Sequence, residues 1–196
     1  MAPKRTRLTG LLHELEDLLD GLGSPFSSCA LPGIDDDQID ELLAPSGIVA
    51  PTQLREWWRW HHGSSFDSPG IDGYTIGAGR WGLMDIPWAL RDRADWLEVD
   101  PDLGEGGWRT GWCPIAFQDF AHGRLVARTS DPFAEEMPIG WYYVFDVPPS
   151  EPIAKSLDEV VDAFIDVIRE GQMYFTPGGW WEQGPRRTEF PLWVGT

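Results

Sequence analysis

The chain has 196 residues, a formal net charge of −17 and 12 tryptophans. That length suits one domain with a sizeable core, so we interpret residues 1–196 as a single domain. The excess of acidic side chains argues against nucleic acid as a direct partner, because phosphate contacts need Lys and Arg, and it favours a basic protein partner or serves solubility alone.

The cysteines and the amino-terminal segment give indications of the cellular compartment in which the protein works. Cys29 and Cys113 provide neither a disulfide framework nor the spacing of a metal site, which is typical of a reducing environment. The amino-terminal segment resembles a signal peptide only as far as Glu14, where acidic residues begin to interrupt the apolar run. No stretch reaches the roughly 20 apolar residues of a membrane span. We therefore expect a cytoplasmic protein that does not associate with a membrane.

Two amphipathic helices are predicted in the first quarter of the chain. In the first, leucines from Leu8 to Leu22 repeat at three- and four-residue spacing, which indicates one buried face. The second begins with Asp35 as N-cap and Gln38 three residues later, a pattern typical of a capping box. Its exposed face carries a row of acids, here called the acidic row: Asp36, Asp37, Asp40 and Glu41.

A third helix is predicted over residues 51–63, PTQLREWWRWHHG, with Pro51 in its first turn and Gly63 just past its end. One face at helical spacing holds Leu54, Trp57, Trp58 and His61, and the opposite face holds Arg55, Glu56 and Arg59. Trp60 lies off the apolar face, which predicts a second covering by the strands that follow. We expect the chain to be organised around this helix, because so short an aromatic helix must pack against something larger.

The middle of the chain, from residue 64 to residue 147, changes to the alternating pattern of strands, with turn signals at SPG, IDG, GEGG and AHG. We expect an antiparallel sheet with strands over 74–78, 81–86, 112–117, 124–128 and 140–147. The last strand is apolar on both faces, which predicts a central strand. The glycines of GAGRWG indicate a tight hairpin, and residues 87–100 indicate a short helix on a crossover.

A final helix and an irregular tail are predicted at the carboxyl end. Ser156 and Glu159 form a capping-box pattern, and Gly171 marks the end of a strongly amphipathic helix. The tail, residues 172–196, has little periodicity, so we expect it to wrap the surface without a regular fold. Trp180 and Trp181 could stack on carbohydrate, but we favour a role in holding the tail against the body. The elements together predict an α+β domain whose core spans residues 8–171.

Catalytic and metal-binding patterns are weak. The sequence contains no GxSxG elbow, Walker loop, HExxH pair or paired CxxC. Adjacent histidines lie about 100° apart on a helix, so His61 and His62 would need Asp67 or His122 to share a metal ion. We expect one packed and one exposed histidine, with no metal and no cofactor. No carboxylate pair lies in an evidently apolar setting that would raise its pKa, so no acid–base pair can be assigned from the sequence.

The order of these elements resembles the SUKH superfamily, which includes the fungal cell-wall assembly regulator proteins. The resemblance covers approximately residues 8–171. It depends on an acidic helix before P-x-x-L-R-x-W-W-x-W-H-x-G, a W-x-P-I-A strand at 112–116 followed by Asp119 and Gly123, and a closing S-L-x-E-x-x-x-x-F-I helix at 156–165. The chain departs from the family in a long loop at 92–107 and in the Trp-rich tail.

The resemblance implies one α+β domain, an antiparallel sheet flanked by amino-terminal helices and a carboxyl-terminal helix, and no catalytic set. Many bacterial members are immunity proteins that bind and neutralise toxin domains, often nucleases. We therefore expect a non-catalytic module that neutralises a basic toxin by stoichiometric binding, with the acidic row as its contact surface. The alternatives are a small hydrolase or lyase and a carbohydrate-binding cell-wall regulatory protein.

Overall fold

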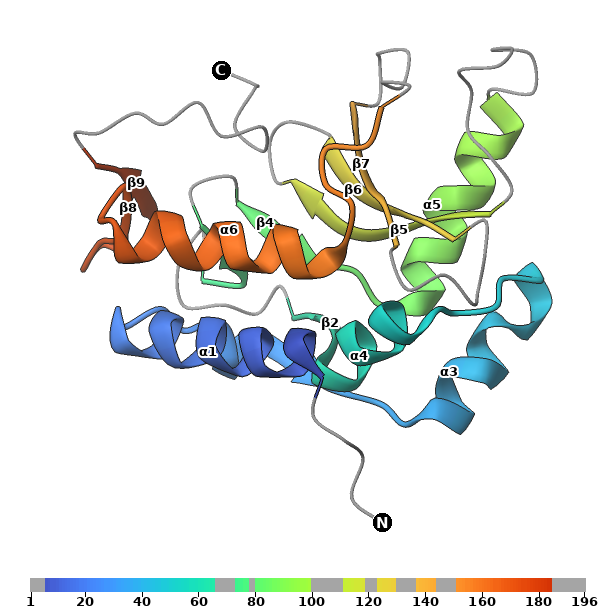
Figure 1. Cartoon of the computed structure of the whole chain (residues 1–196), viewed down its shortest axis with the longest axis horizontal. Helices are drawn as coiled ribbons and strands as arrows, with labels where there is room; N and C mark the ends of the chain where they lie inside the picture. Colours follow the sequence, from blue (N-terminus) through green and yellow to red (C-terminus); the bar gives the residue numbers. More distant parts are fainter. Residues whose placement is uncertain are drawn as a thin grey trace.

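The computed structural model describes residues 6–65, 73–77, 80–99, 111–118, 123–129, 137–143 and 151–184. Its helices are α1 (Arg7–Gly21), α2 (Phe26–Cys29), α3 (Asp36–Leu43), η1 (Ala44–Ser46), α4 (Thr52–Trp60), α5 (Ile86–Val99) and α6 (Leu157–Arg169). Its strands are β1 (Ala30–Pro32), β2 (His61–Ser64), β3 (Thr75–Ile76), β4 (Trp81–Leu83), β5 (Trp112–Gln118), β6 (Gly123–Arg128), β7 (Ile139–Tyr143), β8 (Met173–Phe175) and β9 (Trp181–Gln183). These elements confirm the expected α+β class (Figure 1).

The largest sheet is antiparallel and has the order β3-β4-β5-β6-β7. The hairpin expected at GAGRWG is confirmed, because the Arg80 N–H donates to the Gly77 carbonyl at 2.8 Å between β3 and β4. Within the described sheet, β7 lies at one edge and β5 at the centre, so the expectation of a central strand is wrong for residues 140–143. Residues 144–147 of that expected strand lie outside the described part of the chain. The apolar pattern of β7 has a local cause: Ile139 is bridged by Ala154, and Tyr142 packs on Trp112.

Two hydrophobic clusters lie on opposite faces of this sheet, as the alternation of side chains along β6 shows. Leu125 and Ala127 belong to the main core, whereas Val126 packs with Trp112 and Tyr142 on the other face. The second half of α5 covers that smaller cluster through Trp96 and Leu97. The helix expected over residues 87–100 is therefore confirmed as α5, which runs along the sheet (Figure 1).

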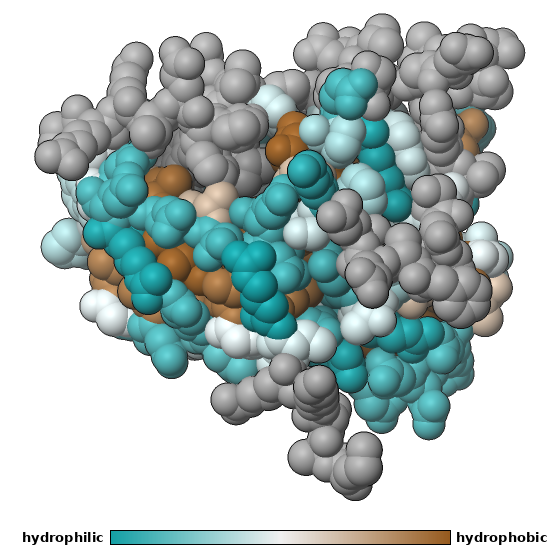
Figure 2. All heavy atoms as spheres, in the orientation of Figure 1, coloured by the Kyte–Doolittle hydropathy of each residue, from teal (hydrophilic) through white to brown (hydrophobic). Residues whose placement is uncertain are grey.

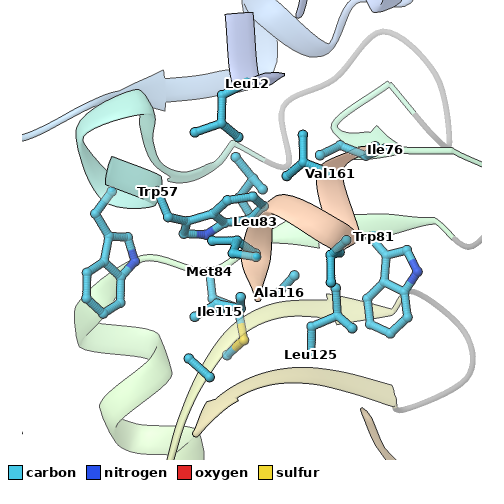
Figure 3. Close-up of a cluster of buried hydrophobic side chains, with 14 of the residues drawn as sticks. Leu12, Trp57, Ile76, Trp81, Leu83, Met84, Ile115, Ala116, Leu125 and Val161 are labelled. Carbon is cyan, nitrogen blue, oxygen red and sulfur yellow. The ribbon is translucent and has the colours of Figure 1, made fainter. Parts of the chain in front are cut away.

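The main core lies between the sheet and helices α1, α4 and α6. Leu12, Trp57 and Val161, one from each helix, converge on the side chains of β4, β5 and β6 (Figure 3). Trp57 retains 2% of its accessible surface and Trp58 none, so the predicted burial of both tryptophans is confirmed. The leucine stripe of α1 is buried as well, at Leu8, Leu12, Leu15 and Leu19.

Helices α1 and α6 run side by side in the same direction (Figure 1). Arg7 near the start of α1 pairs with Asp162 at 2.5 Å, and Glu14 further along pairs with Arg169 at 2.5 Å. The start of α6 is capped as predicted by Ser156, whose hydroxyl accepts from the Glu159 N–H. The Glu159 carboxylate, however, accepts from the Lys155 N–H rather than from that of Ser156.

Helix α4 is shorter than expected, and its face assignments need correction. Pro51 is the extended N-cap, with ψ of 163°, and the helix ends at Trp60 because His61 already pairs with β1 as part of β2. Gly63 does have positive φ, 102°, but within β2. Glu56, assigned to the face opposite the apolar one, is buried, and the Thr6 hydroxyl at the start of α1 donates to its carboxylate at 2.5 Å.

Trp60 is covered both by the strand that follows it and by helices earlier in the chain. The ring of His61, the first residue of β2, lies with its centroid 4.6 Å from that of Trp60. The Trp60 ring stacks on Phe26 of α2 with centroids 5.6 Å apart. Its indole N–H donates to the Glu16 carboxylate of α1 at 3.0 Å. The expected covering by the following strand is thus present at His61, and α1 and α2 add a covering that the sequence analysis did not predict.

The tail was expected to lack regular structure, and for residues 172–184 this is wrong. Strands β8 and β9 form an antiparallel hairpin beside the end of α6, with Tyr174 directly opposite Glu182 (Figure 1). Residues 185–196 lie outside the described part of the chain. Among the described residues, no helix has the length and apolar character needed to cross a membrane.

Candidate functional site

The acidic row lies on α3, a helix whose geometry is fixed at its amino end. The Asp35 carboxylate accepts from the Gln38 N–H, and the Gln38 side chain accepts from the Asp35 N–H, which confirms the predicted capping box. Ile39 and Leu43 are buried and anchor the helix to the core. All members of the row are exposed, and Figure 2 shows a hydrophilic surface over α3 at the lower right.

Arginines of α4 divide the acidic row into an inner and an outer pair. The Arg55 guanidinium donates to the Asp40 carboxylate at 2.5 Å and lies 3.6 Å from that of Asp36. Arg59 also lies 3.6 Å from Asp36. The hydrogen bond to Asp40 raises the pKa of Arg55. Asp36 and Asp40, here called the inner pair, therefore bind α3 to α4.

The outer pair, Asp37 and Glu41, faces away from α4. Within the described ranges neither side chain takes part in an ion pair or hydrogen bond. The two carboxylates are four residues apart on one helix, where like charges repel by about 0.2–0.5 kcal/mol. A cation from a partner would relieve this repulsion, and the ordered helix would present both acids without further immobilisation.

The adjacent histidines have separate structural roles. Because they lie on β2, their side chains point to opposite faces, which replaces the helical arrangement expected from the sequence. His61 lies between the Leu31 carbonyl, 3.1 Å from Nδ1, and the Glu16 carboxylate, 3.4 Å from Nε2. His62 accepts the Ile86 N–H through Nε2 at 3.1 Å, so this nitrogen carries no proton.

Metal binding by these histidines would have required Asp67 or His122, both of which lie outside the described residues. In the part of the chain that the structure describes, no three His, Cys, Asp or Glu side chains are placed to hold a metal ion. Cys113 is buried, and this burial raises its pKa to about 12. Its thiol therefore stays protonated and is unsuited to nucleophilic attack.

The adjacent tryptophans of the tail differ from each other. Trp181 is buried, and its indole N–H donates to the Thr75 carbonyl at 3.2 Å, so this residue holds the hairpin against the body as expected. Trp180 instead is 42% exposed. Its indole N–H donates to the Glu182 carboxylate at 2.9 Å, and the Tyr174 hydroxyl donates to the other oxygen at 2.6 Å.

The arrangement of Tyr174, Trp180 and Glu182, here called the hairpin clamp, was missed by the sequence analysis. A signal was present, because the turn residues of TPGG separate MYF from WWEQ, a pattern that favours a hairpin. The two hydrogen bonds, from Tyr174 first and Trp180 second, lower the pKa of Glu182. The clamp therefore carries a negative charge between two exposed rings.

Comparison of the chain with protein-family models gives no match, and comparison with curated proteins also gives none.

Proposed function

We propose that the protein is a cytoplasmic, non-catalytic binding module that neutralises a basic toxin domain by stoichiometric binding, as the resemblance to the SUKH superfamily implies. The observation that carries the proposal is the outer pair of α3. Asp37 and Glu41 are exposed and ordered, and no cation of the described chain pairs with them. The net charge of −17 would also steer a cationic partner toward the protein.

Neutralisation on this proposal works by occlusion. The acidic face would cover a basic cleft, such as that of a nuclease, and mimic the charge of a phosphate backbone. The proposal reduces the expected contact surface from the whole acidic row to its outer pair. The inner pair already forms ion pairs with arginines of α4, whereas the outer pair remains available to a partner.

The test is co-expression with the carboxyl-terminal domain of a secreted toxin-like protein encoded by a neighbouring reading frame. We expect restored growth and a stable one-to-one complex. Asp37→Asn/Glu41→Gln is expected to slow association at low ionic strength, with a smaller effect as salt rises. The matched control is Asp17→Asn/Asp95→Asn, which removes the same charge from exposed positions on α1 and α5. Continued cell death and no complex would refute the proposal.

A further inference from the structure

The hairpin clamp places two large rings on the surface in a fixed geometry. Among the described residues, the exposed large hydrophobic side chains are Leu31, Val49, Tyr174 and Trp180, and the last two share this hairpin. The Thr176 hydroxyl lies 3.3 Å from the Trp180 N–H and 3.0 Å from its carbonyl, so the backbone at Trp180 is held from both sides. Rings that are ordered before binding lose little conformational entropy on contact.

A glycine sets the position of the Trp180 ring. A Cβ at Gly178 would lie 2.2 Å from the Cζ3 atom of that ring, so the indole occupies space that any other residue would fill. On its edge, the ring is fixed by the hydrogen bond from its N–H to Glu182. The ring is therefore held by backbone, glycine and carboxylate together.

The side chains of the clamp offer only acceptors to a ligand. The hydrogens of the Tyr174 hydroxyl and the Trp180 indole are already donated to Glu182. What remains is the π-faces of two rings, the phenolic oxygen and the second lone pairs of the carboxylate. Ring faces and a carboxylate both attract cations. A sugar would bring acceptors as well as donors, and its acceptors would find no donor on these side chains.

We infer that the hairpin clamp is a receptor for a cationic side chain, Arg or Lys, of a protein partner. Arg matches it most fully, because the guanidinium has donors only, stacks on aromatic faces and pairs with carboxylates. Within the described part of the chain no cation pairs with Glu182, so the charge is available. The inference rests on the proposed function only for the nature of the partner, and it adds a contact far in sequence from α3.

The test uses a peptide of arginines as the probe and the indole 1H–15N resonance of Trp180 as the reporter, with Trp180→Phe supplying the assignment. We expect a saturable shift of that resonance with the arginine peptide, and no saturable shift with a peptide of the neutral isostere citrulline. Glu182→Gln keeps an acceptor but removes the charge, and is expected to weaken binding about three- to fivefold, as exposed ion pairs and cation–π contacts do.

A positioning variant separates ring placement from ring chemistry. Gly178→Ala is expected to displace the indole and weaken peptide binding, whereas Gly10→Ala, on α1 with nothing within 4 Å of the added Cβ, leaves it unchanged. Circular dichroism shows whether each variant is folded. Tyr174→Phe is a second variant that is expected to fold, because it keeps the aromatic ring. It removes the hydrogen bond from the Tyr174 hydroxyl and so frees one lone pair of the Glu182 carboxylate.

Several outcomes would overturn the inference: a Trp180 resonance unaffected by the arginine peptide, an equal response to citrulline, unchanged affinity in Glu182→Gln, or a saturable shift with a neutral oligosaccharide alone. None of these needs a toxin. A failed peptide titration therefore leaves neutralisation by the outer pair untouched, and failed neutralisation leaves the titration result standing.

Discussion

Arg124 of β6 binds Asp92 of α5 through two parallel hydrogen bonds, from Nε at 2.9 Å and from Nη2 at 2.8 Å. The two side chains retain 14% and 11% of their accessible surface. The indole N–H of Trp96 donates to the same carboxylate at 3.3 Å. This fork joins the sheet to the helix that covers its smaller cluster, and it is more sheltered than the ion pairs of α1, α3 and α6.

Removing one member of that pair leaves a nearly buried charge without its partner. Asp92→Ala and Arg124→Ala are each expected to lower the free energy of unfolding by roughly 3 kcal/mol. The double variant is expected to cost clearly less than the sum, because the members of a contacting pair are coupled. Urea denaturation of the four proteins measures this coupling. Additive losses would show that the fork contributes no interaction energy.

The buried tryptophans of α4 give a second prediction. Trp57→Ala and Trp58→Ala are each expected to lower the free energy of unfolding by roughly 3–5 kcal/mol, because both leave large cavities in the core. Trp180→Ala is the matched control, since the same ring is lost from an exposed position. Thermal and urea unfolding measure the difference. Equal stability of the Trp58→Ala protein and the wild type would place α4 outside the core.

His62 predicts a dependence of stability on pH. Burial lowers the pKa of His62, while the carboxylate of Asp85 acts in the opposite direction. The unfolded chain therefore takes up a proton as the pH falls through about 6.5, whereas the folded chain does so only at lower pH. Protonation would also remove the acceptor for the Ile86 N–H. The free energy of unfolding is thus expected to decrease as the pH is lowered below about 6.5.

The contribution of His62 is isolated by comparing variants. His62→Gln keeps an acceptor that does not titrate, and is expected to flatten the pH profile between about pH 5 and pH 6.5. His13→Gln, at an exposed position on α1, removes a histidine without this contact and is expected to retain the wild-type slope. An identical slope in wild type and His62→Gln would contradict the assignment.

The division of the acidic row predicts different effects for its two halves: loss of stability for the inner pair and slower association with a partner for the outer pair. Asp40→Asn is expected to lower the free energy of unfolding by about 0.5–1 kcal/mol, because it weakens the pair with Arg55. Asp37→Asn/Glu41→Gln is expected to change stability by less than about 0.5 kcal/mol, and to slow association with a basic partner about three- to tenfold at low salt. Stopped-flow mixing measures the rates. Equal rates for the wild type and the outer-pair variant would remove α3 from the binding surface.

Elements specified by neighbouring residues could be predicted from the sequence. The stripe of α1, the capping box of α3 and the start of α6 at Ser156 all depend on side chains within one or two turns. The end of α4 could not be predicted, because it depends on the pairing of Pro32 with His61 across the chain. The edge position of β7 likewise follows from strand order, which no local pattern encodes.

The candidate site shows the same limit. That α3 presents acids was evident from helical spacing, but which acids remain available depends on Arg55 and Arg59 of a different helix. The buried carboxylate of Glu56 likewise has its partner on a different element, the Thr6 hydroxyl at the start of α1. The hairpin clamp was missed for another reason: β8 and β9 span three residues each, which is too short for alternation to stand out.

The parallel contact between α1 and α6 sets an order of events during synthesis. Arg7 and Asp162 lie 155 positions apart, so the first helix to be made receives its partner only after nearly all other elements exist. Until α6 has been synthesised, the leucines of α1 that pack against it stay exposed and can form non-native contacts. A chain interrupted before α6 would keep that surface exposed, and would be a target for chaperones and proteases however well its sheet had formed.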